Sequence, residues 1–248
     1  MKYRRPKVLS RNHSCNGLRR TLDRTPYRVV VRLGSVTERD ADLHINTVQS
    51  VKNSSSKFIM KTLFEKHNVN QALWYKDLTN VEFPLVVKRH YGRQGVGMVL
   101  IKDEKELEKF VSSNNIDRYV IEKFYNYSRE YRVHISDLGE IMSWRKLRRS
   151  DSTERWFFNS HNCNWVSSNH ELFNRPDNWE DIIEHCSRAL KATGLNLGAC
   201  DVRVNKKGDF IICEINSAPA LGELGIEQYR DHLNKLIRWK IQDESQDL

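Results

Sequence analysis

The stretch ACDVRVNKKGDFIICEINSAPAL (residues 199–221) places charged and amide side chains inside two otherwise apolar runs. The runs ACDVRV and FIICEI are short and rich in Val and Ile, and the segment NKKGD separates them. Short β-branched runs bounded by Asn, Asp and Gly are typical of two strands joined by a turn. The stretch therefore predicts an antiparallel hairpin, and the charges inside its strands need an explanation.

The polar side chains of this hairpin are predicted to converge. Successive side chains of a strand point to opposite faces, so Asp201 and Arg203 share a face of the first strand. For the same reason Glu214 and Asn216 share a face of the second strand. The two faces meet in the sheet if the register brings the first pair opposite the second.

The turn sets that register. If Asn205 pairs with Phe210 across the turn, Asp201 falls opposite Glu214, and two carboxylates meet an amide oxygen. Hard oxygen ligands of this kind suit Mg²⁺ that is bound partly by the protein and partly by phosphate oxygens. The alternative is a solvent-exposed hairpin face on which the arginine forms an ion pair with one of the carboxylates.

Length and composition favour an ordinary globular protein. The chain has 248 residues, 39% of them hydrophobic and 10% aromatic, enough for one large domain or two small ones. No apolar run approaches the length of a membrane span, and the start MKYRRPKVLS has no signal-peptide core, so we expect neither an anchor nor a secretory signal. Five cysteines without CxxC spacing indicate reduced thiols in a cytoplasmic protein rather than a zinc site.

The positive charge points to acidic partners. The formal net charge is +9, and basic residues gather between Lys2 and Arg32 and again in WRKLRRSD (144–151). Such an excess favours nucleotide phosphates, nucleic acid or an acidic protein as partners, although a solvated basic surface explains the N-terminal cluster equally well.

The order of elements predicts an α+β protein. Helices are expected within residues 46–68, broken near residues 53–55, and over 103–113, 178–193 and 226–241. Strands are expected at 27–35, on both sides of a glycine loop in 83–101, and as three successive strands in 117–149, whereas a polar loop is expected over 150–176. Antiparallel hairpins alternating with helices disfavour a Rossmann fold.

Two further motifs indicate a nucleotide site. Lys88 ends the apolar strand PLVVK and precedes a loop with glycines at 92, 95 and 97, which let the backbone approach an anion while the lysine supplies a point charge. A hairpin that needs three glycines is the alternative. In VIEKF, the Glu122 backbone is placed to pair with an adenine edge, and Glu130 is placed to accept hydrogen bonds from ribose hydroxyls; a charged strand on a wet sheet face is the alternative.

In this order the motifs resemble those of the ATP-grasp carboxylate-amine ligases, the superfamily of the ribosomal-protein glutamate ligase, D-alanine ligase and glutathione synthetase group. The resemblance covers roughly residues 45–240. It implies an ATP-grasp fold in which two α+β subdomains grip ATP between antiparallel sheets. It also implies three parts: a reduced basic N-terminal segment (1–45), a subdomain with the glycine-rich phosphate loop (46–125) and a subdomain with the magnesium site (126–248).

The resemblance assigns roles to residues at matching positions. The magnesium ligands that it implies are Asp201, Glu214 and Asn216. For the charge on the reacting phosphoryl group and the acylphosphate, we predict stabilisation by Arg132, Arg145 or Arg203. The nucleotide contacts that it implies are Lys57, Lys88, Gly92, Gly95, Gly97, Glu122, Lys123 and Glu130. The loop departs from the family pattern, because Arg89 stands where Pro is usual and Arg93 where Ser is usual. The segment SAPAL (217–221) resembles the loop that faces the acyl substrate.

The implied activity is an ATP-dependent ligase that forms an amide bond through an acylphosphate and releases ADP and phosphate, with ATP and Mg²⁺ as cofactors. The acceptor is expected to be an acidic peptide or protein tail, or else a small molecule such as a dipeptide or an amino sugar acid. A different reading is a nucleic-acid-binding protein on an ATP-grasp scaffold without ligase turnover. No membrane partner is expected, and the oligomeric state cannot be inferred from these features.

Overall fold

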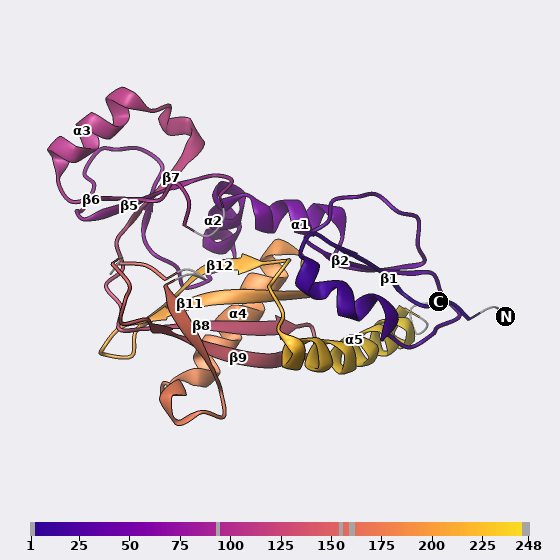
Figure 1. Cartoon of the computed structure of the whole chain (residues 1–248). Coiled ribbons are helices and arrows are strands. Elements are labelled where there is room, and N and C mark those ends of the chain that lie inside the picture. Colours follow the sequence, from indigo (N-terminus) through magenta and orange to yellow (C-terminus); the bar gives the residue numbers. More distant parts are fainter. Residues whose placement is uncertain (1–2, 93–94, 154–155, 159–161, 245–248) are drawn as a thin grey trace.

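A five-stranded antiparallel sheet forms the centre of the molecule in the computed structural model, which describes residues 3–92, 95–153, 156–158 and 162–244 (Figure 1). Its strand order is β10-β9-β8-β11-β12. The strands are β8 (Arg129–Ser136), β9 (Gly139–Arg148), β10 (Cys163–Ser167), β11 (Leu197–Val204) and β12 (Phe210–Asn216). The predicted α+β class and the predicted strands in 117–149 are confirmed.

Three helices cover one face of the central sheet. They are α1 (Val48–Ser55), α2 (Lys57–Lys66) and α4 (Trp179–Thr193). Ser56 separates α1 from α2, because its side chain accepts a hydrogen bond from the backbone N–H of Ile59 and so caps the second helix. Gly194 ends α4 in the left-handed conformation with φ 73°, directly after the last residue of the predicted helix 178–193.

A smaller sheet projects from the central body (Figure 1). Its strand order is β4-β7-β5-β6, and α3 covers it. The elements are β4 (Trp74–Tyr75), β5 (Leu85–Arg89), β6 (Val99–Ile101), α3 (Glu104–Ser113), the 3₁₀ helix η2 (Ile116–Arg118) and β7 (Tyr119–Lys123). The glycine loop joins β5 to β6, so it lies at one end of this sheet.

The N-terminal segment forms a third, parallel sheet with the order β1-β2-β3. It consists of β1 (Lys7–Ser10), the 3₁₀ helix η1 (His13–Arg20), β2 (Val29–Leu33) and β3 (Leu43–Ile45). The last helix, α5 (Glu223–Glu244), packs against it and shares a core with it. No helix in the described residues is long and apolar enough to cross a membrane.

The expected division at residues 45 and 125 remains a prediction. The hydrophobic cores cut across the boundary at residue 125, because Met60 and Phe64 of α2 lie in the core of the central sheet together with Tyr131 and Ile182. The small sheet has a core of its own that includes Leu85. Residues 46–72 are therefore packed mainly with the central sheet rather than with the glycine loop.

The register of the β11–β12 hairpin differs from the prediction at the turn and agrees with it at the site. Val204, not Asn205, pairs with Phe210, because Asn205 caps the turn by accepting hydrogen bonds from the backbone N–H groups of Lys207 and Asp209. A β-bulge next to Val202 then shifts the register by one residue. As a result Asp201 lies opposite Glu214, as predicted.

The prediction of a loop throughout residues 150–176 is wrong in part. β10 lies within it and pairs antiparallel with β9, so that Trp165 stands opposite Lys146, and a short 3₁₀ helix η3 follows at Glu171–Phe173. The segment CNWVS lacks clear alternation, and only the neighbouring edge of β9 makes it a strand. His161 of the same segment lies outside the described residues, and the His170 ring accepts a hydrogen bond from the backbone N–H of Leu172.

Gly34→Ala is expected to destabilise the protein by roughly 2 to 4 kcal/mol. Gly34 has φ +79°, and a Cβ there would lie 2.5 Å from the Cβ of Ala218, so the substitution adds a clash to backbone strain. Gly139→Ala is the control, because Gly139 also has a positive φ, +101°, but has nothing within 4 Å of the added Cβ. Urea unfolding of both variants measures the difference. An equal loss of stability in both would contradict the close contact at Ala218.

Candidate active site

A cavity of about 790 Å³ lies where the three sheets meet. One wall is the loop between β5 and β6, the floor is the central sheet, and the far end is formed by the start of η1 and the segment after β12. Every described residue that the sequence marked as a magnesium ligand lines it, together with Lys57, Lys88 and Glu130. Residues from positions 11 to 220 thus share one site.

Asp201 is buried on the floor between two cations. Both of its carboxylate oxygens accept hydrogen bonds of 2.9 Å from Arg132, which faces it across the β8–β11 register. The ammonium of Lys146 lies 3.3 Å from the same carboxylate. Burial alone would raise the pKa of Asp201, but these two cations outweigh burial and hold the pKa below its usual value.

Glu214 lies beside Asp201 and anchors a lysine from α2. The Nζ of Lys57 is 3.0 Å from one carboxylate oxygen, and the side-chain amide of Asn216 donates a 3.1 Å hydrogen bond to the other. The charge of Lys57 lowers the pKa of Glu214, and Glu214 in turn raises the pKa of Lys57. The first residue of α2 is therefore held against β12 of the charged hairpin, near the end away from the turn.

Glu130 is buried on β8 and joins two basic side chains. The Nζ of Lys146 lies 2.5 Å from one of its oxygens, and the Nε of Arg203 donates a 2.9 Å hydrogen bond to the other. The guanidinium of Arg203 also stacks over the Tyr127 ring, 4.2 Å from its centroid. Glu130 thus orients Lys146 and Arg203 on the cavity floor, and it shares Lys146 with Asp201.

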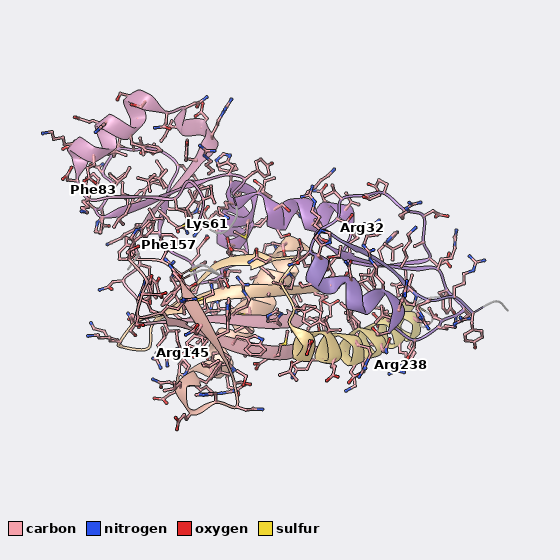
Figure 2. The ribbon with its side chains drawn as sticks, in the orientation of Figure 1. Arg32, Lys61, Phe83, Arg145, Phe157 and Arg238 are labelled. Atoms are coloured by element: carbon pink, nitrogen blue, oxygen red, sulfur yellow. The ribbon has the colours of Figure 1, made fainter. Side chains whose placement is uncertain are left out.

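A second ion-pair cluster lies beneath the glycine loop. Glu122 on β7 is buried between Lys88 of β5 and Lys61 of α2, with the Lys61 Nζ 2.7 Å from its carboxylate. Figure 2 labels Lys61. Burial tends to raise the pKa of Glu122, but the two lysines outweigh it and lower the pKa to about 2. Lys61 is a residue that the sequence reading missed, although it follows Lys57 by one helical turn. Lys88 lines the cavity, whereas Glu122 and Lys61 support it from behind.

The glycine loop contacts the opposite wall. Gly95 has φ +75°, and a Cβ there would lie 2.6 Å from the ring of Phe157, so only glycine lets the loop approach this side chain. Gly92 and Gly95 line the cavity together with Arg89 and Phe158. Gly97 has φ +74° and lies against the side chain of Arg89 instead. Arg93 falls outside the described residues.

Two predicted site residues point elsewhere. Arg145 donates a hydrogen bond to the backbone oxygen of Leu172. It lies opposite Tyr131, whose side chain packs in the core under α2 and α4, so it is on the face of the central sheet away from the cavity. Its neighbour Lys146 takes the place in the cavity, because alternate residues of β9 face opposite sides. Lys123 forms an exposed ion pair with Glu82 and does not line the cavity.

The sequence reading also missed residues from regions without a motif. Trp165 of β10 lines the cavity and lies under Arg132, with the guanidinium carbon 5.0 Å from the ring centroid. Arg11 and His13 line its far end. Nothing in the sequence around these residues indicates the site, because tertiary packing alone brings them there.

The donor set of the hairpin is compatible with a magnesium ion. Asp201, Glu214 and Asn216 supply two carboxylates and an amide oxygen, and all three residues line the same cavity. No group of three or more His, Cys, Asp or Glu side chains that could enclose a metal lies within the described residues. A divalent cation here would need further oxygen ligands from phosphate or water, as is usual for Mg²⁺.

Comparisons with known proteins agree with this geometry. The family model for the D-ala D-ala ligase C-terminus matches residues 48–227. The coenzyme gamma-F420-2:alpha-L-glutamate ligase of Methanococcus maripaludis is 21% identical over 222 residues, 82% of this chain and 73% of that protein. The D-alanine–D-alanine ligase of Bacillus anthracis complexed with ATP aligns with a TM-score of 0.65 at 16% identity, over 99% of this chain and all of that one. An L-amino acid ligase from Bacillus licheniformis aligns with a TM-score of 0.60 at 13% identity, over 92% of this chain and 70% of that one.

Two antiparallel sheets that close on a lysine-rich cavity define an ATP-grasp protein, and this fold binds ATP. The match over residues 48–227 covers most of the chain, so the chain belongs to the D-ala D-ala ligase C-terminus family. The protein is an ATP-grasp carboxylate-amine ligase.

Proposed function

We propose that the protein activates a carboxylate as an acylphosphate and transfers the acyl group to an amine. A carboxylate oxygen attacks the γ-phosphorus of ATP, and the bond to the β,γ-bridging oxygen breaks to release ADP. The amine nitrogen then attacks the acyl carbon, loses a proton and expels inorganic phosphate. The observation that supports this most is a single cavity that joins Lys57, Lys88 and Lys146 to the oxygens of Asp201 and Glu214.

In this mechanism the chain supplies charge and position rather than a strong base. Lys57 and Lys88 are placed to bind phosphate oxygens, and Lys146, Arg132 and Arg203 are held by buried carboxylates at fixed positions on the floor. Fixed cations of this kind stabilise developing charge without reorganising. Asp201, Glu214 and Asn216 would hold Mg²⁺, which supplies Lewis-acid neutralisation of the phosphates when bound. Glu130 would accept a hydrogen bond from a ribose hydroxyl.

The substrate is proposed to be acidic. The methanogen relative is named as a glutamate ligase, and the net charge of +9 favours an acidic partner. The cavity argues against the nucleic-acid reading. Its floor cations Arg132, Lys146 and Arg203 are each paired with a buried carboxylate and are not presented on an open surface.

The test is ADP release with Mg-ATP and pooled amino acids, acidic peptides and short nucleic acids, in the presence of hydroxylamine. Hydroxylamine displaces phosphate from an acylphosphate and gives a hydroxamate, whose mass identifies the acid. Release that depends on one pool, with the matching hydroxamate, supports the ligase. ATP binding without hydroxamate in any pool would contradict acylphosphate chemistry on these acids.

Lys146→Met should lower kcat/KM for ADP release about 10²-fold, because it removes one fixed cation from the floor of the cavity. Arg145→Met, one residue away on the same strand, should leave the kinetics unchanged, since this side chain lies outside the cavity. Steady-state rates, scaled to the folded fraction by circular dichroism, compare the two. A larger loss of kcat/KM in Arg145→Met than in Lys146→Met would show that Arg145, not Lys146, acts in the site.

A further inference from the structure

The far end of the cavity has a different character from its floor. It is lined by residues 11–13, Gly34, residues 54–55 and residues 217–220. The hydroxyls of the two serines donate to the backbone oxygen of Val51 within their own helix. Among the residues that line this end, Arg11 carries the fixed positive charge, and it is exposed.

The position of Arg11 is fixed by the fold. Its backbone N–H donates a 3.0 Å hydrogen bond to the oxygen of Leu33, at the end of β2. Gly34, the residue after β2, lies against Ala218 in the segment after β12. A hydrogen bond of 3.0 Å from the N–H of Leu221 to the Ser14 hydroxyl joins the start of η1 to the same segment. The N-terminal segment is thus attached directly to the chain that follows the charged hairpin.

Arg11 has no acid left to pair with in the cavity. Each of the three carboxylates that line it, Glu130, Asp201 and Glu214, lies within 3.0 Å of a floor or helix cation. By contrast, in the residues that the structure describes, no ion pair involves Arg11. An arginine at the wall of a cavity without a carboxylate partner offers a fork of donors to an incoming anion.

We propose that the acid substrate carries a second anionic group, and that Arg11 binds it. The proposal rests on the proposed ligase function. The carboxylate to be phosphorylated must lie next to the phosphates, beside the Lys57–Glu214 ion pair, so the rest of that substrate extends along residues 217–220 toward Arg11. The substrate class is then a dicarboxylic amino acid or a peptide with an acidic residue. Arg11 selects the substrate and takes no part in bond making.

Two matched sets of acids test this. One set is L-glutamate, L-aspartate and L-Glu-L-Glu, and the other is L-glutamine, L-asparagine and L-Gln-L-Gln, which have nearly the same shape and lack the side-chain charge. Hydroxamate formation with Mg-ATP and hydroxylamine is measured for the full chain. The acidic set should react, and the amide set should react at least tenfold more slowly, because an unpaired arginine rejects an analogue without the anion.

Substitution of Arg11 separates its role from the chemistry. Arg11→Gln should raise the KM for the acid by roughly 10- to 100-fold while the KM for ATP stays unchanged. Arg19→Gln, at the exposed other end of η1, is the matched control and should change neither value. An equal KM for the acid in the Arg11 variant and the unmodified protein would overturn the proposal.

The remaining outcomes distinguish this inference from the ligase itself. Equal or faster reaction of the amide set would overturn the second anionic group and leave the acylphosphate chemistry standing. Hydroxamate from a monocarboxylate outside both sets, with none from the acidic set, would also overturn the second anionic group while supporting acylphosphate chemistry. No hydroxamate from any acid, with ATP bound, would remove the ligase proposal and this inference with it.

Discussion

Glu214→Gln should lower the rate of ADP release about 10³-fold, equivalent to several kcal/mol in the transition state. The substitution keeps the size of the side chain and removes its charge. Two consequences follow from the contacts of Glu214. The oxygen that holds Lys57 at 3.0 Å loses its charge, and the proposed magnesium donor set loses one of its two carboxylates. Rates with the acid found by hydroxamate trapping measure the effect.

A binding measurement separates metal from catalysis. Mn²⁺ binding in the presence of ADP, followed by electron paramagnetic resonance, should weaken in the Glu214 variant by a similar order to the rate. Glu223→Gln, an exposed position at the start of α5, is the control. Near-normal turnover of the Glu214 variant at saturating Mg²⁺ would show that this carboxylate is not a metal ligand.

The sequence could predict the fold where the pattern is local. Strand alternation, the Ser56 cap and the Gly194 cap depend on residues close in the chain, so the helices and most strands were predictable. β10 was not, because it is an edge strand whose only support is its neighbour β9. The parallel N-terminal sheet was also out of reach, since its three short strands are joined only through tertiary packing.

The site follows the same division. Asp201 opposite Glu214 was predictable from alternation, although the bulge that keeps this pair in place was not. Whether Arg145 or Lys146 lines the cavity depends on which face of β9 is turned toward it. Both residues are basic and stand in a run of basic residues, so no hydrophobic alternation indicates the buried face. Arg11 and Trp165 stand in segments far from any motif. For such residues only the folded chain shows that they share a cavity.

The ion pairs of the floor explain how so many cations can be buried together. Lys146 is buried, which by itself would lower its pKa, yet Asp201 and Glu130 outweigh burial and raise the pKa. It therefore stays charged at neutral pH and keeps its place. A phosphate group that enters meets cations already oriented by carboxylates, so little rearrangement opposes binding.

The largest loss of stability is expected from Glu122→Gln, about 3 to 5 kcal/mol. This carboxylate is shared by Lys61 and Lys88, and its removal leaves two buried ammonium groups without their counter-charge. In the unmodified protein, the pKa of Glu122 falls from 4.5 to about 2 on folding. Its contribution is therefore fully present above pH 4.5 and is lost as the pH falls toward 2. Urea unfolding between pH 3 and 8 measures both effects.

The pH dependence of the stability of Glu122→Gln shows whether unpaired lysine charge causes the loss. Burial and the charge of Lys88 lower the pKa of Lys61, so without Glu122 the unfolded chain binds more protons than the folded one at alkaline pH, and the variant should gain stability as the pH rises. Adding Lys61→Met should recover part of the loss, because it removes one unpaired charge. Glu82→Gln breaks only the exposed pair with Lys123 and serves as the control. A loss in Glu122→Gln no greater than in this control would mean that the cluster beneath the glycine loop does not stabilise the fold.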